Sequence, residues 1–426
     1  MIKKIVLQNK LEKEEFYNEN YINRDNLISA KKELDSSLIK LIMGPRRSGK
    51  STFAFLLLKN KDFAYINFDD ENLLKVDDFD SIIEAIHEVY GTIKYLFFDE
   101  IQNLPSWELF INKLKRRKYK IVLTSSNANM LSQDIATVLT GRYTVYEILP
   151  FSLTEYLTIK EVEFSEEIFS LPKKNAEILK ATNSYLINGG YPEILHDNIS
   201  ERNYLSTLFD ATIFKDIIVR YKIRNSVKLK ELAYYLIANF TSLFTYNSLT
   251  RNLKFKSVET LEKYISYLES SYLFFTLNRF SFKHKLQNSS PKKIYIIDNG
   301  YIKSKAIRFS SDYGRLLENA VFIEFLRRKY VQNETLFYYN CKQGKEIDFI
   351  TKNITEVTGI FQVAYSLDDK LTRKREIAAL VIAKKELDCD NLYIITWNKE
   401  ETILLNDDTI INVIPFYKWV LTKKQK

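Results

Sequence analysis

The sequence predicts an α/β fold whose N-terminal part is a three-layer sandwich, with one parallel sheet between two layers of helices. Three observations predict it. A glycine-rich loop follows an apolar run near residue 40, a second apolar run ends in carboxylates at residues 99 and 100, and apolar runs alternate with helical stretches up to residue 149. Such alternation is typical of parallel sheets, because a helix carries the chain back between neighbouring strands. The expected strands are residues 38–43, 63–68, 95–100, 120–124 and 144–149.

Length and composition are those of a soluble multidomain protein. Of the 426 residues, 46% are hydrophobic and 27% are charged, and at about 150 residues per domain we expect two to four domains. The two cysteines, Cys341 and Cys389, exclude a disulfide framework. Because no apolar run is long enough for a signal peptide or a membrane span, we expect a cytoplasmic protein without membrane contact. The net charge of +9 permits nucleic-acid binding without requiring it.

A phosphate-binding loop follows the first strand. It has the form Gly-x-x-x-x-Gly-Lys-Ser and lies between that strand and a helix of apolar residues at 52–58. The glycines let successive backbone N–H groups point at phosphate oxygens, and the helix adds its positive N-terminal end. Lys50 is expected to reach the β- and γ-phosphates of ATP, and the Ser51 hydroxyl to bind Mg²⁺. The predicted nucleotide-binding residues are Gly44, Pro45, Arg46, Arg47, Ser48, Gly49, Lys50, Ser51 and Thr52.

The third strand ends in Asp99 and Glu100, the pattern called Walker B. Asp99 is suited to hold Mg²⁺ through its water shell, and Glu100 to orient and polarise the water that attacks the γ-phosphate. An apolar strand that ends in two carboxylates is common by itself. Because this one comes about 50 residues after a phosphate-binding loop, it indicates a nucleotide-hydrolysing site.

Two further positions are candidates for contacts with the γ-phosphate. The fourth strand is followed by Ser126 and Asn127, where P-loop ATPases place a polar sensor, although both residue types also favour helix starts. Arg142 ends the sequence Leu-Thr-Gly-Arg and precedes the fifth strand. It is either an arginine finger, acting in its own chain or on a neighbouring copy, or a surface arginine.

Together these motifs resemble the large prokaryotic family of AAA-type ATPases that carry a C-terminal domain of unknown function. The resemblance rests on Gly-Pro-Arg-Arg-Ser-Gly-Lys-Ser, Phe-Phe-Asp-Glu-Ile-Gln-Asn, Leu-Thr-Gly-Arg and Leu-Pro-Phe-Ser-Leu-Thr-Glu-Tyr. It continues in Asn-Gly-Gly-Tyr-Pro-Glu at 188–193, Tyr-Ile-Ile-Asp-Asn-Gly at 295–300, Gly-Arg-Leu-Leu-Glu-Asn at 314–319 and Glu-Ile-Asp-Phe at 346–349. It implies a P-loop core of the AAA (ASCE) class, a helical lid, a winged-helix module and a C-terminal α/β domain that resembles restriction endonucleases.

The middle of the chain is expected to hold the lid and the winged helix. The predicted helices are 165–181, 203–221, 227–240 and two that start near 247 and 257, before a strand at 272–280. The helix over 257–270 is the candidate DNA-recognition helix. Three lysines are expected near phosphates: Lys254, Lys256 and Lys263. Three glutamates make its surface acidic as well: Glu259, Glu262 and Glu269. A protein-docking or purely structural module is therefore the alternative.

The C-terminal part has the order of residues found in restriction endonucleases, with Glu318 on a helix, Asp348 on a strand and Gln362 on the next strand. In such sites carboxylates hold a divalent metal and a lysine positions the attacking water. The lysine position here is Ala364 and a glutamine replaces one carboxylate, so we predict an inactive, vestigial nuclease site. A lysine from elsewhere could supply the role: Lys342 or Lys345. The alternative for the two carboxylates is surface ion pairing, with Arg315, Arg327 or Lys345.

The predicted function is Mg²⁺-dependent ATP binding and hydrolysis that rearranges the attached modules, in a DNA-linked process. The alternatives are a nucleotide-dependent protein-docking switch with slow turnover and an ATP-regulated, metal-dependent nuclease. The expected partners are ATP, Mg²⁺, and double-stranded DNA or a protein, and a homo-oligomer is compatible with this class. The expected domains are 1–155 (ATPase core with N-terminal cover), 156–200 (lid), 201–300 (winged-helix module) and 301–426 (nuclease-like domain).

Overall fold

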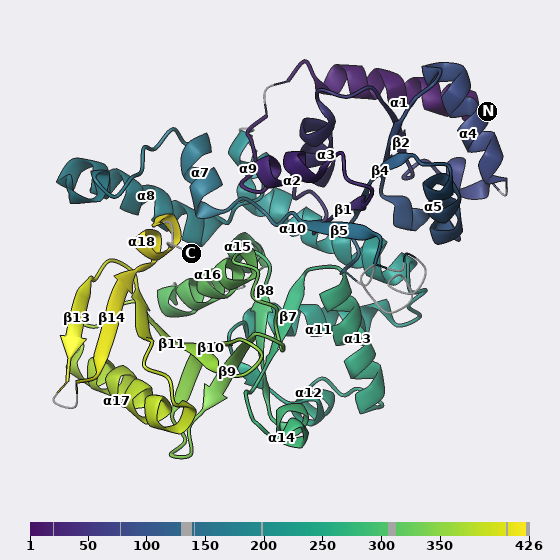
Figure 1. The fold of residues 1–426 in the computed structure, drawn as a ribbon. Helices are drawn as coiled ribbons and strands as arrows, with labels where there is room; N and C mark the ends of the chain where they lie inside the picture. Colours follow the sequence, from purple (N-terminus) through teal and green to yellow (C-terminus); the bar gives the residue numbers. More distant parts are fainter. Residues whose placement is uncertain are drawn as a thin grey trace. The chain divides into compact units, whose positions relative to one another are not determined.

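The computed structural model describes residues 1–19, 21–76, 78–128, 139, 141–196, 199–305, 312–405 and 408–422. The chain forms two compact units (Figure 1). Unit 1 is Met1–Pro150 with Ser270–Tyr272, and unit 2 is Phe151–Glu269 with Leu273–Lys426. Thr140, part of the Leu-Thr-Gly-Arg motif, lies outside the described residues.

Unit 1 is built on a five-stranded parallel sheet in the order β2-β3-β4-β1-β5. The strands are β1 Ile39–Met43, β2 Phe63–Asn67, β3 Tyr95–Asp99, β4 Lys120–Ser125 and β5 Tyr143–Glu147. The predicted parallel sheet is confirmed, and the strand ends differ from the predicted ones by at most two residues. Because the strands are parallel, their carboxyl ends meet at one edge, where the loop after β1 lies.

The helices of unit 1 cover this sheet. They are α1 Ile2–Phe16, α2 Leu27–Glu33, α3 Lys50–Leu58, α4 Phe79–Tyr90 and α5 Trp107–Arg116, with short 3-10 turns η1 Leu73–Lys75 and η2 Ile101–Asn103. The apolar helix α3 is buried against the sheet, and the ring centroid of Phe55 lies 5.2 Å from that of Phe97 on β3. At the N-terminus, α1 packs on α4 and β2, and Lys13 Nζ donates to the carbonyl oxygen of Phe63 at 2.7 Å. The predicted N-terminal cover is thus a helix fixed to the sheet.

The helices after residue 150 begin in the region predicted to form a lid. They are α7 Leu153–Ile159, η4 Ile168–Ser170, α8 Pro172–Asn188, α9 Glu193–His196, α10 Glu201–Thr212, the π-helix η5 Ile213–Val219, α11 Ser226–Ala238, α12 Tyr246–Asn252, α13 Val258–Ser270, α14 His284–Ser289, α15 Asn299–Lys305, α16 Tyr313–Arg327, α17 Lys370–Leu387 and α18 Phe416–Leu421. The lid helix predicted over 165–181 starts later, because Pro172 suits a first helical position, and it ends before Gly189, whose φ is 81°. Within the described part of the chain, no helix combines the length and the apolar composition needed to cross a membrane.

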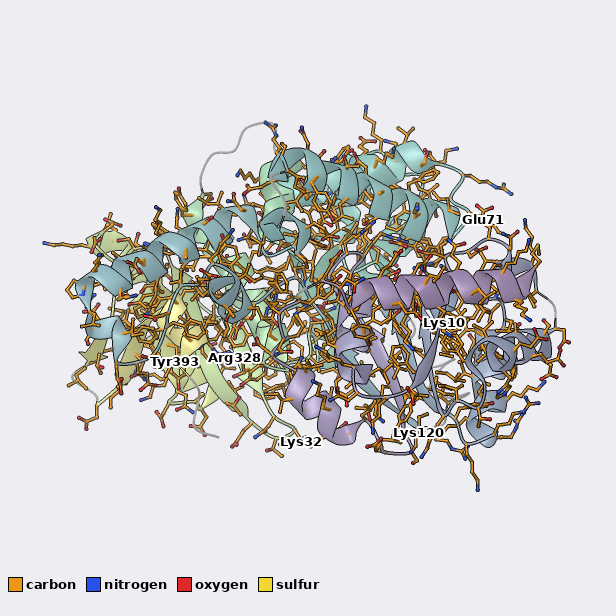
Figure 2. All side chains as sticks on the ribbon, turned by 90° about the horizontal axis from the view of Figure 1, so that it is seen from above. Lys10, Lys32, Glu71, Lys120, Arg328 and Tyr393 are labelled. Carbon is orange, nitrogen blue, oxygen red and sulfur yellow. The ribbon has the colours of Figure 1, made fainter. Side chains whose placement is uncertain are left out.

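Unit 2 contains two sheets. A three-stranded antiparallel sheet has the order β6-β8-β7, and a six-stranded mixed sheet has the order β13-β14-β12-β11-β10-β9. The strands are β6 Leu243–Phe244, β7 Phe274–Asn278, β8 Lys292–Ile296, β9 Leu336–Asn340, β10 Glu346–Lys352, β11 Val357–Ala364, β12 Leu392–Thr396, β13 Glu401–Leu404 and β14 Ile410–Pro415. Aromatic rings join the large sheet to its helices, with Phe325 and Phe361 centroids 5.0 Å apart. The guanidinium of Arg328, labelled in Figure 2, lies 4.0 Å from the ring centroid of Trp419.

Candidate functional site

The loop after β1 has the curled backbone that suits phosphate groups. Gly44 has a φ of 151° and Gly49 a φ of 88°, both in the region that favours glycine. A side chain at Gly44 would place its Cβ 2.0 Å from the carbonyl oxygen of Ile148, so only glycine fits there. Helix α3 begins directly after Gly49 and contributes the free N–H groups of its first turn.

Two side chains of this loop are suited to bind an anion. Lys50 is buried at the start of α3, and its ammonium donates to the carbonyl oxygen of Pro45 at 3.0 Å. The hydroxyl of Ser48 is buried and has no hydrogen-bond partner among the described residues. Because an unpaired buried hydroxyl is costly, this group fits a site built to contact phosphate oxygens.

The carboxylate of Asp99 lies at the end of β3 among hydroxyl groups. Ser51 Oγ donates to Asp99 Oδ1 at 3.0 Å, Thr124 Oγ1 donates to the same oxygen, and the Tyr65 hydroxyl donates to Oδ2 at 3.3 Å. Burial raises the pKa of Asp99 to about 6, because the charged form loses its hydration. A hard cation would favour the charged form again. The adjacent oxygens of Ser51 and Asp99 therefore fit a Mg²⁺ ion.

Glu100 is held by several groups and has a left-handed backbone, with φ 50° and ψ 41°. Its Oε2 accepts from Ser126 Oγ at 3.0 Å and from Gln102 Nε2, and its Oε1 lies 3.5 Å from Lys50 Nζ. Burial acts to raise the pKa of Glu100, but the charges of Lys50 and Arg46, together with these hydrogen bonds, outweigh it and lower the pKa to about 2. Glu100 is thus a fixed, ionised carboxylate, as a group that polarises water must be.

Sequence reasoning missed two residues of this site. Gln102 donates to Glu100, while its own Oε1 is buried without a partner in the described part of the chain. Arg24, which precedes α2, is buried and donates to the carbonyl oxygens of Ser48 at 2.8 Å and Leu149 at 2.6 Å. Arg24 therefore ties the phosphate loop to the chain that follows β5.

The remaining predicted site residues do not all converge. Asn127 is half-buried after β4, and its N–H donates to Ser125 Oγ at 3.1 Å. Arg142 is exposed, and its carbonyl oxygen accepts from the N–H of Ile39 at 2.9 Å. Because Ile39 begins β1 whereas the phosphate loop follows the end of β1, Arg142 lies at the opposite edge of the sheet. The structure does not bring Arg142 to Lys50 or Glu100 of its own chain.

A second charged site lies in unit 2, and it contains a lysine that the sequence did not indicate. Lys293 on β8 is only 3% exposed, and its Nζ lies 2.8 Å from Glu318 Oε1, 2.7 Å from Glu346 Oε1 and 3.0 Å from Asp348 Oδ1. We call these three carboxylates the acidic cluster. Burial acts to lower the pKa of Lys293, but Glu318 and the neighbouring groups outweigh it and hold that pKa well above its usual range. Ion pairing is thus observed for Glu318 and Asp348, but with a buried lysine.

The residues of the predicted vestigial nuclease site lie close to one another. The N–H of Asp348 donates to Gln362 Oε1 at 2.8 Å, and Asp348 Oδ2 accepts from the N–H of Val363 at 2.9 Å. Ala364, which stands where the nuclease pattern has its lysine, is buried. Of the two lysines considered as replacements, Lys342 is exposed and Lys345 is half-buried, and neither has an ion pair with the acidic cluster in the described structure.

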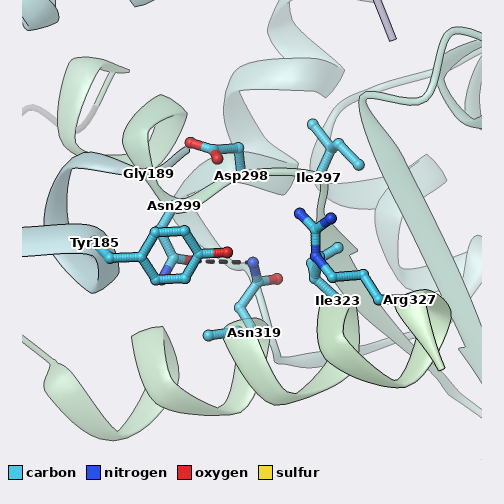
Figure 3. Close-up of a pocket in the computed structure, with 9 residues that line it drawn as sticks. Tyr185, Gly189, Ile297, Asp298, Asn299, Asn319, Ile323 and Arg327 are labelled. Carbon is cyan, nitrogen blue, oxygen red and sulfur yellow. Dashed lines mark hydrogen bonds between the residues drawn. The ribbon is translucent and has the colours of Figure 1, made fainter. Parts of the chain in front are cut away.

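Another polar centre of unit 2 surrounds a small pocket with room for about one water molecule (Figure 3). Asp298 is buried there and accepts from the N–H groups of Gly190 and Gly300, both at 2.8 Å. A Cβ at Gly189 would lie 1.7 Å from Asp298 Oδ1, so the Gly-Gly turn is required for this packing. Burial raises the pKa of Asp298 to about 6. Two of the sequence motifs, at 188–193 and 295–300, therefore form one packed centre.

The region of the candidate recognition helix α13 exposes both positively and negatively charged side chains to solvent. Its neighbourhood has three exposed lysines, namely Lys254, Lys256 and Lys263. Glu259 and Glu262 are exposed as predicted, but the prediction that Glu269 lies on the same surface is wrong. Glu269 Oε1 accepts from the N–H and the hydroxyl of Thr276, at 3.0 and 2.7 Å, so this carboxylate fixes the helix to β7.

Comparison with known families divides the chain into three matched regions. Residues 36–157 match an AAA domain. Residues 179–312 and 313–419 match two domains of unknown function, DUF8612 and DUF4143. The chain is 37% identical to an uncharacterized protein of Methanocaldococcus jannaschii over 417 residues, which cover 94% of this chain and 91% of that protein. It is 30% identical to an uncharacterized protein of Haemophilus influenzae over 371 residues, 82% of this chain and 87% of that protein.

Likeness to solved structures is weak. The Aeropyrum pernix ORC1 protein in complex with DNA aligns with a TM-score of 0.32 and 10% identity, over 72% of this chain and 95% of that chain. A DNA replication initiation factor aligns with a TM-score of 0.27 and 18% identity, over 59% of this chain and 90% of that chain. Scores this low carry no inference about function.

Proposed function

Because this chain belongs to the same family as the Methanocaldococcus jannaschii protein and contains an AAA domain followed by two domains of unknown function, we propose that it binds ATP with Mg²⁺ at the loop of unit 1 and hydrolyses it. The observation that carries this proposal is the convergence of Lys50, Ser51, Asp99 and Glu100 at one edge of the sheet, beside the unpaired hydroxyl of Ser48. An unpaired donor, an ammonium and free helix N–H groups match a polyphosphate.

In the proposed mechanism each residue has a separate task. Lys50 binds oxygens of the β- and γ-phosphates, and Ser51 and Asp99 hold Mg²⁺, which supplies neutralisation of phosphate charge when bound. A phosphate oxygen that takes up the Lys50 ammonium would compete with Glu100 Oε1, now 3.5 Å from Lys50 Nζ. Glu100 then has one oxygen to orient the attacking water, while Ser126 and Gln102 hold the other.

Steady-state ATP hydrolysis by the purified full chain tests this proposal. We expect Mg²⁺-dependent turnover that falls by about 10²- to 10³-fold in Glu100→Gln, because an amide cannot polarise the water. ATP binding should persist in that variant, because the loop is untouched. Turnover equal in the wild type and Glu100→Gln would show that the measured hydrolysis does not come from this site.

We also propose the four-part division of the chain given above, with a winged-helix module and a nuclease-like C-terminal domain. The order α11-β6-α12-α13-β7-α14-β8 and the antiparallel sheet β6-β8-β7 support the first assignment. The order α16-β9-β10-β11-α17-β12, with Glu318, Asp348 and Gln362 on its first helix and strands, supports the second. A switch that docks proteins through the same modules is the competing function.

The exposed lysines on and just before α13, Lys254, Lys256 and Lys263, favour a DNA-linked role over protein docking. A double-stranded DNA fragment should bind with an affinity that falls steeply as salt rises, because phosphate contacts release counterions. The variant Lys254→Gln/Lys256→Gln/Lys263→Gln, which removes three positive charges, should reduce both the affinity for DNA and the dependence of that affinity on salt. Unchanged DNA binding in this variant would place the DNA contact elsewhere on the chain, and no DNA binding by the wild type at low salt would favour the protein-docking switch. Stimulation of ATP turnover by the same DNA would link the two units.

A further inference from the structure

We propose that the Lys293 ammonium takes the place of a divalent cation in the acidic cluster of unit 2. On this proposal Glu318, Glu346 and Asp348 form a metal-independent ion-pair centre, and they can hold a divalent cation only after Lys293 is removed. The inference concerns unit 2 and is independent of ATP hydrolysis at the loop of unit 1.

The ammonium occupies the position that a bridging cation would need. Lys293 Nζ contacts one oxygen of Glu318 at 2.8 Å and one oxygen of Asp348 at 3.0 Å, so it lies between the two carboxylates that a bridging metal would use. Glu346 Oε1 closes the same centre at 2.7 Å. Asp348 Oδ2 is occupied by the N–H of Val363. A metal at this position would have to displace the ammonium.

Displacement of the ammonium would itself be costly. Lys293 is buried among its partners, and a buried charge that loses them pays a large desolvation cost. Glu318 Oε1 also accepts from the Tyr295 hydroxyl at 2.9 Å, which fixes that carboxylate toward β8 rather than toward solvent. Among the described residues, no group of three or more His, Cys, Asp or Glu side chains is arranged to hold a metal ion.

The position of Lys293 also explains what its ammonium holds together. Lys293 belongs to β8 of the three-stranded sheet, whereas Glu346 and Asp348 belong to β10 of the six-stranded sheet and Glu318 to α16. In a metal-dependent nuclease the same carboxylates would be arranged around a cation that exchanges with solvent. Here the cation is the ammonium of Lys293, part of the chain itself, and its ion pairs join β8, β10 and α16. The centre is therefore a structural link within unit 2, and the fold does not use it for metal-dependent phosphodiester cleavage.

Binding of Mn²⁺ without added nucleotide tests the proposal, with free Mn²⁺ measured by electron paramagnetic resonance. Four proteins share the same unit 1 site, so its contribution cancels: the wild type, Asp348→Asn, Lys293→Met and Lys293→Met/Asp348→Asn. We expect the wild type to bind no more Mn²⁺ than Asp348→Asn. Lys293→Met should bind one Mn²⁺ ion more than the double variant does. The affinity of the acidic cluster for that ion should be at least about tenfold higher than any affinity it shows in the wild type. A folded Lys293→Met protein that gains no ion would overturn the proposal.

A second measurement keeps the proposal testable if Lys293→Met does not fold. The unfolding temperature of the wild type should be the same in EDTA and in Mn²⁺. If Mn²⁺ does change it, the unfolding temperature of Asp348→Asn should change by the same amount. Glu318→Gln and Asp348→Asn should lower it in EDTA as much as in Mn²⁺, because the ammonium and not a metal loses its partner. Stabilisation of the wild type by Mn²⁺ that disappears in Asp348→Asn would show a native metal site and refute the proposal.

Discussion

Each unit of this protein buries a lysine beside carboxylates, and the two lysines are held very differently. Both are almost inaccessible, with exposed fractions of 4% for Lys50 and 3% for Lys293. Lys50 Nζ lies 3.5 Å from one carboxylate, Glu100, and donates to a backbone carbonyl oxygen. Lys293 Nζ lies within 3.0 Å of three carboxylates. Burial does not distinguish the two lysines, whereas the number and distance of their anionic partners does.

The difference separates a binding residue from a structural one. An ammonium with one distant anionic partner can exchange that partner for a phosphate oxygen at low cost. The unpaired hydroxyl of Ser48 lies in the same loop and can donate to the same phosphate group. An ammonium with three close partners has no such exchange to make, because any new anion would have to displace a better one. We therefore expect Lys50 to matter for activity and Lys293 to matter for stability.

The largest expected effect is on the stability of unit 2. Lys293→Met should lower its free energy of unfolding by about 3–5 kcal/mol, because three carboxylates lose their buried counterion. Urea unfolding followed by tryptophan fluorescence measures it. In a Trp107→Phe background the remaining tryptophans, Trp397 and Trp419, both belong to unit 2 and report on that unit alone.

The matched control is Lys285→Met, which removes an exposed lysine of the same unit and should change this free energy by less than about 0.5 kcal/mol. Equal stability of Lys293→Met and Lys285→Met would contradict the view that the acidic cluster depends on its ammonium.

Loss of the other lysine should act on turnover. Lys50→Ala should reduce kcat for ATP by about 10²- to 10³-fold, because the charge that develops on the phosphates loses its counterion. The control is Lys59, an exposed lysine just after α3, and Lys59→Ala should leave kcat unchanged. If Lys50→Ala instead lowered stability as much as Lys293→Met and left turnover intact, the assignment of roles would be reversed.

Asp99→Asn should stabilise unit 1 while it abolishes hydrolysis. Burial raises the pKa of Asp99 from its usual 3.8 to about 6, so the folded protein binds a proton more tightly than the unfolded chain between these values. The cost of the ionised form is fully present above pH 6 and disappears as the pH falls toward 4. We expect the amide variant to gain about 3 kcal/mol at pH 7.5 and about 1 kcal/mol at pH 4.5.

Hydrogen exchange of peptides from β1 and β3, compared with the wild type at each pH, measures this gain. Asp62→Asn, which changes an exposed carboxylate of the same unit, is the control. A variant less stable than the wild type at both pH values would show that the hydrogen bonds to Asp99 outweigh its desolvation.

Most of unit 1 could be predicted because its signals are local. Each strand is a short apolar run. Lys50 and Ser51 follow the loop after β1, and Asp99 and Glu100 lie at the end of β3, so a parallel sheet brings these motif residues to one edge. Arg24 could not be found in this way. It donates to the backbone carbonyl oxygens of Ser48 and Leu149, the second 125 residues away, and a contact to backbone is not marked by any pattern of residue types.

The lysine of unit 2 escaped prediction for a different reason. The replacements considered, Lys342 and Lys345, are near Asp348 in sequence, whereas Lys293 precedes Glu318 by 25 residues and Asp348 by 55. It reaches them because β8 packs on α16 and the Lys293 side chain extends to two carboxylates of β10, a tertiary arrangement that strand periodicity does not report. Gln102 is the opposite case. A polar residue two positions after Glu100, in a turn that is otherwise partly apolar, was a local signal for a group that positions the carboxylate.

The smallest predicted effect concerns that positioning residue and sharpens the comparison between the two lysines. Gln102 donates to Glu100 Oε2 and to Ser126 Oγ, so it fixes the oxygen that Lys50 does not contact. Gln102→Ala should lower kcat by about tenfold, because the carboxylate loses one of the bonds that aim it at water. The Kd of ATP should not change, because Gln102 has no hydrogen bond to the phosphate loop in the described structure.

This split between kcat and Kd distinguishes a positioning role from a general loss of structure, which would weaken both. The side chain of the neighbouring Asn103 donates to Asp69 Oδ1 at 2.8 Å. Its backbone N–H donates to the carbonyl oxygen of Glu100 at 3.0 Å, a bond that alanine keeps, so Asn103→Ala with unchanged kcat is the matched control. If Gln102→Ala instead weakened ATP binding and left kcat intact, Glu100 would be oriented by Lys50 and Ser126 alone. In that case the 3.5 Å contact between Lys50 and Glu100 would be a lasting ion pair like those of Lys293, and Lys50 would not be free to exchange it for phosphate.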